Sequence, residues 1–389
     1  MATYISSNAN RFYAAIEENY GLAAPITSAN RYPAIRLQAQ QILERGKRLD
    51  KTGTRTLLGM PKQARRHTGF ETRTYLSSWN GSGEPGYGVL FQSAMGGAGQ
   101  QSSKLQVAVV NGPVQLQTRT PHSLSVGSAI SFLNEVRFVT GVPDPLSIAF
   151  NAPFTSPPSS GATLAPTVTY MLSTTLPSVT LYDYWDPVTT VSRVVTGAAV
   201  NSLSISINGD YHEFAFSGPA SDLLDSSSFQ TGTGGLSTFP TEPGAAAFDY
   251  SVVPGHLGQV WLGSEASQFF TLTEASIELR NNLDVRNREF GSSIPRAVVP
   301  GTRQVGSSFT VLAQDDAQTA GLYRAAKQRS TISAMLQLGQ QQGQLMGIFL
   351  PTVTPEIPNY NDSEARLQWE FRNNMAQGVH NDEIYIAFA

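Results

Sequence analysis

The stretch Ser202-Leu-Ser-Ile-Ser-Ile-Asn-Gly-Asp-Tyr-His-Glu-Phe-Ala-Phe216 decides the fold class of this chain. Its first half puts Leu203, Ile205 and Ile207 on one face of a strand and the serines on the other, because side chains alternate along a strand. The Asn-Gly pair that follows is among the strongest short hairpin signals, since both residues tolerate positive φ. The stretch predicts an antiparallel hairpin with one buried face.

The order of element types around this hairpin occurs twice in the chain. The first copy has a basic stretch, a strand, a helix-like segment and the hairpin, at 41–67, 70–76, 86–98 and 202–216. The second has a charged loop, a strand, a helix-like segment and a hairpin-like pair, at 282–306, 308–313, 316–338 and 347–354 with 365–371. A mainly β fold is predicted, with two tandem β-sandwich or barrel modules, each with a flanking α-helix.

The predicted domain boundaries follow changes in composition. Residues 1–98 and 181–220 form a discontinuous first module, and a short helix is expected near 10–18. Residues 99–180 contain short strands split by Gly and Pro, which indicates a small inserted β domain. Residues 221–247 are predicted to be a linker from their Ser, Asp, Thr and Pro content, and residues 248–389 the second module.

Composition narrows the class of function. The 389 residues are 40% hydrophobic and only 14% charged, below the roughly 25% charged content of typical soluble domains. This balance suits a protein covered by copies of itself, and it equally suits an ordinary Ser/Thr-rich β protein. A net charge of −3 argues against a dedicated nucleic-acid binder, and zero cysteines exclude a thiol nucleophile. No run of 18 apolar residues occurs, so no membrane partner is expected, and folding in a cytoplasm is predicted.

No catalytic constellation, cofactor site or metal site is predicted, so the chain is not expected to be an enzyme. Gly81-Ser-Gly-Glu-Pro-Gly86 matches a dinucleotide-binding pattern, but no acid stands where the ribose partner belongs. Asp183 and Asp186 lie among aromatic residues and would point to opposite faces of a strand. One of them is a candidate for lining a water-filled channel, and an ordinary strand end before Pro187 is the alternative.

A basic loop at residues 41–67 is the strongest local signal. It carries Arg45, Lys47, Arg48, Lys51, Arg55, Lys62, Arg65 and Arg66. A solvated face and a nucleic-acid site are possible, but aromatic residues for base stacking are absent. Docking onto an acidic surface of another copy is favoured, because the fork of arginine pairs with carboxylates. The corresponding loop of the second copy carries Arg286, Arg288, Arg296 and Arg303.

Several stretches resemble the tail tube proteins of long-tailed bacteriophages. Thr68-Gly-Phe-Glu-Thr-Arg-Thr-Tyr-Leu76 and Tyr87-Gly-Val-Leu-Phe-Gln-Ser-Ala-Met-Gly-Gly97 are similar to the early region of that family. So are the opening Ala15-Ile-Glu-Glu-Asn-Tyr-Gly21 and the later Val195–Ser206 and Val305–Thr310. The resemblance implies a structural virion protein whose rings stack into a hollow tube through which phage DNA passes. The loop at 41–67 would then reach the neighbouring ring.

The family usually carries one tube module and forms hexameric rings. Two modules in this chain imply a trimeric ring with pseudo-sixfold symmetry, assembled in the host bacterial cytoplasm. Expected partners are further copies of the chain, other tail proteins at the tube ends, a tape measure protein in the lumen, and DNA that passes without specific binding. The inserted domain would lie on the outer surface. Two alternatives stay open: a tail adaptor or baseplate ring protein that does not polymerise, and a carbohydrate-binding β protein.

Overall fold

Strands dominate the structure of this chain. The structure is a computed structural model that describes residues 4–44, 49–51, 53–56, 59, 64–79, 83–187, 190–244, 250–263, 267–269 and 271–389. The described part contains two α-helices, α1 (Gly88–Met95) and α2 (Ala317–Gln328), and no helix in it is long and apolar enough to cross a membrane. The prediction of a mainly β fold is confirmed.

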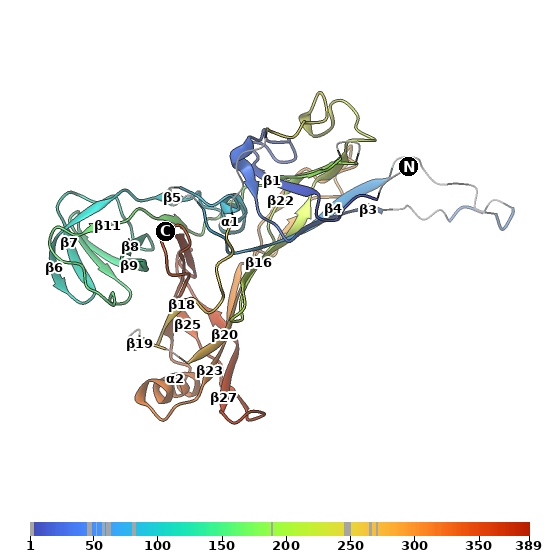
Figure 1. Ribbon diagram of the computed structural model, residues 1–389. Coiled ribbons are helices and arrows are strands. Elements are labelled where there is room, and N and C mark those ends of the chain that lie inside the picture. Colours follow the sequence, from blue (N-terminus) through green and yellow to red (C-terminus); the bar gives the residue numbers. More distant parts are fainter. Residues whose placement is uncertain are drawn as a thin grey trace.

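One large sheet joins most of the chain (Figure 1). Its main path is β19-β18-β24-β25-β27-β23-β20-β15-β16-β4-β3, with β5, β12, β26 and β28 attached. The strands are β3 (Arg36–Glu44), β4 (Arg65–Tyr75), β5 (Gln100–Gln101), β12 (Val168–Tyr170), β15 (Ser202–Ile207), β16 (His212–Ala220), β18 (Gly258–Gly263), β19 (Ser267–Gln268), β20 (Leu272–Arg280), β23 (Gln304–Leu312), β24 (Ile332–Leu338), β25 (Met346–Thr354), β26 (Asn359–Asn361), β27 (Gln368–Ala376) and β28 (Tyr385–Phe388). The predicted hairpin is β15–β16, paired from Ser202↔Ser217 to Ile207↔His212.

Two similar units of four strands lie side by side in this sheet. The first is β3-β4-β16-β15, and the second is β20-β23-β27-β26. In each unit a hairpin (β3–β4 or β20–β23) precedes an α-helix (α1 or α2) in the sequence. The units meet where β15 pairs with β20, from Ser202↔Arg280 to Ile207↔Ala275. The strand-then-helix order predicted for both copies agrees with this repeat. The hairpin-like pair expected from 347–354 and 365–371 is wrong, because β25 pairs mainly with β24 and β28, whereas β27 forms its hairpin with β26. The division into domains stays a prediction.

Helix α1 fills the core between two sheets. The ring of Phe91 packs against those of Phe214 and Phe216 on β16, at centroid distances of 5.4 Å and 5.1 Å. Apolar residues of a five-stranded sheet belong to the same core and contact the other side of the helix. Its order is β17-β14-β13-β1-β2, with β1 (Asn10–Ile16), β2 (Arg31–Tyr32), β13 (Val179–Trp185), β14 (Arg193–Ala198) and β17 (Asp222–Asp225). Helix α2 covers the second unit on the same face, where Tyr323 contacts Trp369.

Two expected helices are wrong in whole or in part. Residues 10–16, expected to be helical, form β1, because pairing with β13 buries Phe12 and Ala14 on one face and Tyr13 on the other. The helix expected over 316–338 ends at Gln328, where Arg329 takes a positive φ of 53°, and β24 follows. The ladder between β24 and β25 prevails there over helical propensity.

The predicted linker at residues 221–247 is folded in its described part. Asp222–Asp225 form β17, which pairs with β14. Phe229, Leu236 and Phe239 then pack over the outer face of the five-stranded sheet, against a cluster that includes Tyr182. Composition alone missed this segment, because its few apolar residues are spaced without the period of a helix or strand.

A separate six-stranded sheet occupies residues 105–164, within the predicted insertion. Its order is β11-β6-β7-β10-β9-β8, with β6 (Leu105–Gly112), β7 (Gln115–Thr118), β8 (Ala129–Phe132), β9 (Glu135–Asp144), β10 (Ser147–Phe150) and β11 (Thr163–Leu164). This sheet takes up less of the chain than the predicted insertion at 99–180. The flanking strands β5 and β12 pair with each other instead, and β12 also pairs with β28 of the large sheet. A short ribbon of β21 (Asp284–Val285) and β22 (Val298–Val299) completes the described strands.

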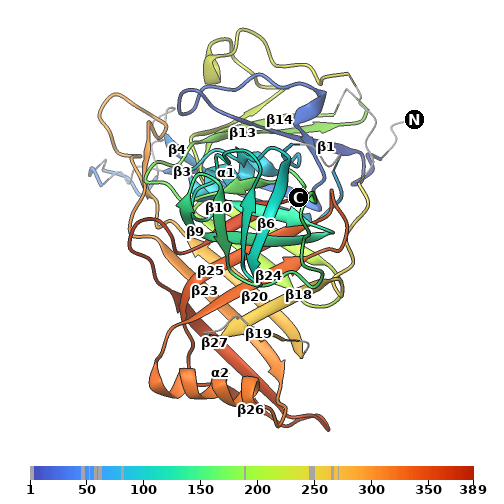
Figure 2. The same cartoon turned by 90° about the vertical axis from the view of Figure 1, so that its left-hand side faces the viewer.

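The six-stranded sheet is held against the large sheet by a buried polar contact. Figure 2 shows it in front of β24 and β25. The Arg137 side chain is fully buried; it donates to Glu135 (2.6 Å) and to the Pro153 carbonyl oxygen, and it stacks on Trp261 of β18, 4.1 Å from the ring centroid. The side chain of Gln337 on β24 accepts a hydrogen bond from the Val136 amide at 2.8 Å. The insertion is therefore packed against the large sheet as well as linked to it through the chain.

Replacing Arg137 with Met is expected to lower the free energy of unfolding by about 3–5 kcal/mol, because Glu135 would stay buried without its cation. The exposed Arg119 of the same region, changed to Met, is a matched control and should stay within about 0.5 kcal/mol of the parent. Urea denaturation of both variants measures the difference. Equal stability of the two variants would contradict a stabilising role for the Arg137 contacts.

His212 gives a prediction about pH. Its side chain is buried on β16, and burial lowers the pKa of the imidazole from 6.5 to about 4. Between these values the unfolded chain binds a proton that the folded chain does not, so stability falls as the pH drops. The loss between pH 7 and pH 5 should be about 2 kcal/mol for this group. Thermal unfolding at the two pH values measures this loss of stability, and in His212→Gln the loss should be smaller by about that amount. A loss as large as that of the parent would contradict the role of His212.

Candidate functional site

The polar face of the large sheet is a continuous strip that neither α1 nor α2 covers. Side chains at alternate positions point away from α1 and α2, and paired residues cross the strip in rows such as Gln38, Glu71, Ser217, Ser202, Arg280 and Gln304. The polar strip is defined by Arg36, Gln38, Glu71, Arg73, Ser202, Ser204, Ser206, Glu213, Ala215, Ser217, Glu274, Ser276, Glu278, Arg280, Gln304, Gly306, Ser308, Thr310, Glu370 and Arg372.

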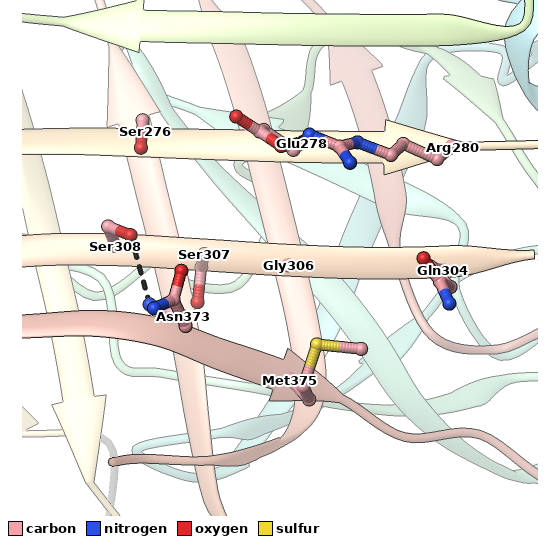
Figure 3. Close-up of a pocket in the computed structure, with 9 residues that line it drawn as sticks. All are labelled: Ser276, Glu278, Arg280, Gln304, Gly306, Ser307, Ser308, Asn373 and Met375. Atoms are coloured by element: carbon pink, nitrogen blue, oxygen red, sulfur yellow. Dashed lines mark hydrogen bonds and ion pairs between the residues drawn. The ribbon is translucent and has the colours of Figure 1, made fainter. Parts of the chain in front are cut away.

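Hydroxyl groups and ion pairs make up most of this strip. Figure 3 shows its part on β20, β23 and β27, a shallow hollow of about 210 Å³. There Glu278 and Arg280 lie along β20, and the Ser308 hydroxyl accepts a hydrogen bond from the Asn373 amide at 3.3 Å. The hollow is open, and the strip brings together no residues in a catalytic arrangement. No cluster of metal-ligating side chains occurs in the described residues.

One end of the strip is basic. Because the strands are antiparallel, the chain leaves β3 at Glu44 and leaves β20 at Arg280 on the same side. Of the predicted docking residues, Lys51, Arg55 and Arg65 are exposed. Arg45, Lys47, Arg48 and Lys62 lie outside the described residues. In Figure 1, β3 and β4 point away from the inserted sheet, toward the opposite end of the molecule.

Arg66 has a different role from Arg65. Its guanidinium donates two hydrogen bonds to Asp222 of β17, at 3.0 Å and 2.7 Å, and Gln41 donates to the same carboxylate at 2.7 Å. Asp222 is buried, and its exposed fraction is only 4%. Arg66 therefore anchors the base of the β3–β4 hairpin inside the chain, and its role in docking stays a prediction.

The structure brings the second predicted loop, residues 282–306, against the first. The Arg66 amide donates to the Ser293 carbonyl oxygen at 2.8 Å, and the Asn287 side chain donates to Glu44 at 3.3 Å. Arg286 and Arg296 are exposed and both face Glu289, while Arg288 is exposed. Arg303 is mostly buried, between the Ser173 carbonyl oxygen and the side chains of Asn381 and Glu383. Three of the four arginines thus lie at the surface of the basic end.

The opposite end of the strip is acidic, which sequence reasoning missed. Its turns follow β15, β23 and β26 and carry Asp210, Asp315, Asp316, Asp362 and Glu364, with Arg366 beside them. Asp316 also caps α2, where it accepts a hydrogen bond from the Thr319 amide at 2.6 Å. These acids were visible in the sequence, but only the strand pairing shows that they share one end.

Two of the open edges of the large sheet lie at the outer ends of the two four-stranded units. β3 pairs with β4 alone, over nine residue pairs, and β26 pairs with β27 alone. The amide of Arg66, the partner of Leu43, bonds to Ser293 and not to β3, so Leu43 makes no backbone hydrogen bond to β4. Hydrogen-bonded and non-hydrogen-bonded pairs alternate along an antiparallel ladder. The backbone groups of Leu37, Ala39, Gln41 and Leu43 therefore point to the open side of β3. The edge is nine residues long, the side chains of Ile42 and Leu43 on it are exposed, and open edges of this kind can pair with a further strand.

Comparison with known families identifies the chain. The family model described as phage tail tube protein matches residues 22–372. The chain belongs to the phage tail tube protein family. A search of curated proteins finds no match.

Membership in the tail tube family confirms the resemblance seen in the sequence. It makes the protein a structural component of the phage tail, and a family of this kind implies association with copies of itself and with other tail proteins. A structural role, not a catalytic one, follows from the family.

The two acids predicted for a channel do not lie on the polar strip of this tail tube protein. Asp183 is 1% exposed on β13, where it pairs with Arg193, so it is the less suitable of the two candidates for lining a water-filled channel. Asp186 is exposed at the end of the same strand, and its role stays a prediction. Both belong to the five-stranded sheet, whose register the sequence did not reveal.

Charge reversal should separate the two neighbouring arginines of the hairpin base. Arg66→Glu is expected to lower the free energy of unfolding by roughly 3 kcal/mol or more, because it places a second acid beside the buried Asp222. Arg65→Glu, one residue away and exposed, should stay within about 0.5 kcal/mol of the parent. Urea denaturation measures both. Equal losses would contradict the assignment of Arg66 as an internal anchor.

Proposed function

We propose that this tail tube protein closes into rings by adding β3 of one copy to β26 of the next, and that the rings stack into a hollow tube for DNA. The supporting observation is the pairing of β15 with β20 inside the chain. β20 begins the second four-stranded unit as β3 begins the first, and β26 ends the second unit as β15 ends the first. The contact within one chain is therefore a template for the contact between two.

Ring closure in this manner removes both open edges. A contact between two different edges of the same sheet is heterologous, and repeating it generates either a ring or a helix. Each chain contributes two four-stranded units, so three copies would give six units around one ring. We therefore propose a trimeric ring with pseudo-sixfold symmetry, in which the polar strip faces the lumen and α1, α2 and the six-stranded sheet face outward.

The charges at the two ends of the strip support head-to-tail stacking. The basic end presents Lys51, Arg55 and Arg65, and the acidic end presents Asp315, Asp362 and Glu364. Opposite charges at opposite ends favour one stacking direction, because inverting a ring would bring like charges together. The side chain of Phe290, fully exposed at the basic end, adds an apolar contact to the proposed interface. In this arrangement the basic loop at residues 41–67 would reach the next ring.

The proposed location and partners of the protein are based on its family. The virion tail is the site of function, and assembly would occur in the cytoplasm of the bacterial host. Tail proteins at the two ends of the tube and a tape measure protein in the lumen are the proposed partners, with no cofactor and no membrane partner. DNA would pass through without specific binding.

Negative-stain electron microscopy of the purified chain tests the assembly. Rings or tubes are expected, with three copies per ring when the ring mass is measured. Ala39→Pro should abolish them, since proline removes an amide that points to the open side of β3. The chain should stay folded, because that amide bonds to nothing within the β3–β4 ladder. Ala39→Ser is the matched control and should assemble normally.

Two outcomes would overturn parts of the proposal. Rings that form unchanged in Ala39→Pro would exclude addition at the β3 edge, and six chains per ring would exclude the trimer. Lys51→Glu, Arg55→Glu and Arg65→Glu combined should leave single rings but prevent stacks, because the end charges would then repel. Normal stacks of this variant would exclude charge-directed stacking.

A further inference from the structure

The arginines of the polar strip are all paired with glutamates of the same strip. Arg36 bonds to Glu71 at 2.9 Å, and Arg73 bonds to Glu71 at 2.6 Å and to Glu213 at 3.3 Å. On the second unit, Arg280 bonds to Glu278 at 2.9 Å, and Arg372 bonds to Glu370 at 2.7 Å. No arginine of the strip is left without an acid.

Three of these pairs have the same local arrangement. Glu71-Thr-Arg73 on β4, Glu278-Leu-Arg280 on β20 and Glu370-Phe-Arg372 on β27 each place an acid and a base two residues apart. Residues i and i+2 of a strand share a face, so the acid and the base are neighbours on that face. In all three pairs the acid comes first in the sequence. The residue between them faces the core: Thr72, Leu279 and Phe371 are buried. The spacing therefore puts both charges on the strip and pairs them locally.

The most exposed of these pairs adds little to stability. The side chains of Glu278 and Arg280 are 50% and 58% exposed, and exposed ion pairs contribute about 0–1 kcal/mol. Their effect on the surface potential is larger. Four arginines against five glutamates, with Glu274 as the fifth, leave the strip a formal charge of −1. The hydrogen bonds from Arg36 and Arg73 also lower the pKa of Glu71, which keeps that carboxylate ionised.

We propose that the glutamates of these pairs mask the arginines from the phosphates of duplex DNA, so that DNA moves along the strip without being held. This inference rests on the proposed function, in which the strip faces the lumen. Unpaired arginines on a DNA-facing wall bind phosphate and release counterions, and each such contact slows movement along the wall. An acid beside each arginine occupies the guanidinium fork without making the wall strongly repulsive. Serine hydroxyl groups fill the strip between the pairs.

Removing the masking acids should create DNA binding in the purified chain. The variant carries Glu71→Gln, Glu213→Gln, Glu278→Gln and Glu370→Gln, which leave the strip arginines without their partners. Binding to a 30-base-pair duplex is measured by fluorescence anisotropy at 50 mM and 200 mM NaCl. Four newly available cations predict an affinity that falls roughly 100-fold over this range, while the parent chain shows no binding at either salt.

The control separates masking from net charge. Glu18→Gln, Asp315→Asn, Asp362→Asn and Glu364→Gln remove the same number of exposed acids, three of them from the turns at the acidic end, and leave every arginine of the strip paired. This control should not gain comparable binding. Equal gains in both variants, or no gain in the strip variant, would overturn the masking role. The single change Glu278→Gln is a fallback if the fourfold variant does not fold, with a salt dependence near that of one phosphate contact, about threefold to fourfold over the same range.

The two proposals can fail separately. Electron microscopy of the parent chain decides whether rings form, without reference to DNA. Masking holds if the strip variant binds DNA as a dispersed chain even where rings are absent. It is refuted if rings form and the strip variant binds DNA no better than the control. In tubes of the strip variant, DNA retained at low salt and released at high salt would place the effect inside the lumen.

Discussion

The pairing of β15 with β20 is the contact on which the rest of the structure depends. Six antiparallel residue pairs join two four-stranded units that are otherwise separated by about fifty residues of chain. On the buried side, Leu203 and Ile205 meet Leu279 and Ile277, so the ladder is fixed by apolar contacts as well as backbone hydrogen bonds. On the other side, serines face Glu278 and Arg280. A shift by one residue would exchange these faces and destroy both the core and the polar strip.

The sequence predicted the parts of the fold that have a clear period. Alternation and the Asn208-Gly209 turn gave the β15–β16 hairpin, and the repeated strand-then-helix order gave both units with their helices. It failed where tertiary pairing prevailed over local preference, as in β1 and β24. The segment after Ser221 was misassigned because Phe229 and Leu236 fill gaps on a sheet without forming a regular element.

The candidate site was predictable only in part, for a related reason. Residue type identified the basic loops, and the structure leaves Lys51, Arg55 and Arg65 exposed there. Residue type could not show that Arg66 points inward to Asp222 while its neighbour points outward, since this depends on which face of β4 each occupies. The acids of the strip were equally hidden. Glu278 and Glu370 lie far apart in the sequence and share a surface only through the ladders of β20, β23 and β27.

The buried contact at Arg137 has a mechanical consequence. The six-stranded sheet meets the large sheet through Phe138, Trp261 and Phe349 in a shared apolar cluster, and Gln337 bonds to both β8–β9 and its own strand's turn. These contacts hold the six-stranded sheet in one orientation on the large sheet. A force applied to the far tip of the insertion would therefore be transmitted to β18, β24 and β25 of the large sheet, and bending of these strands would move the tip by a larger distance.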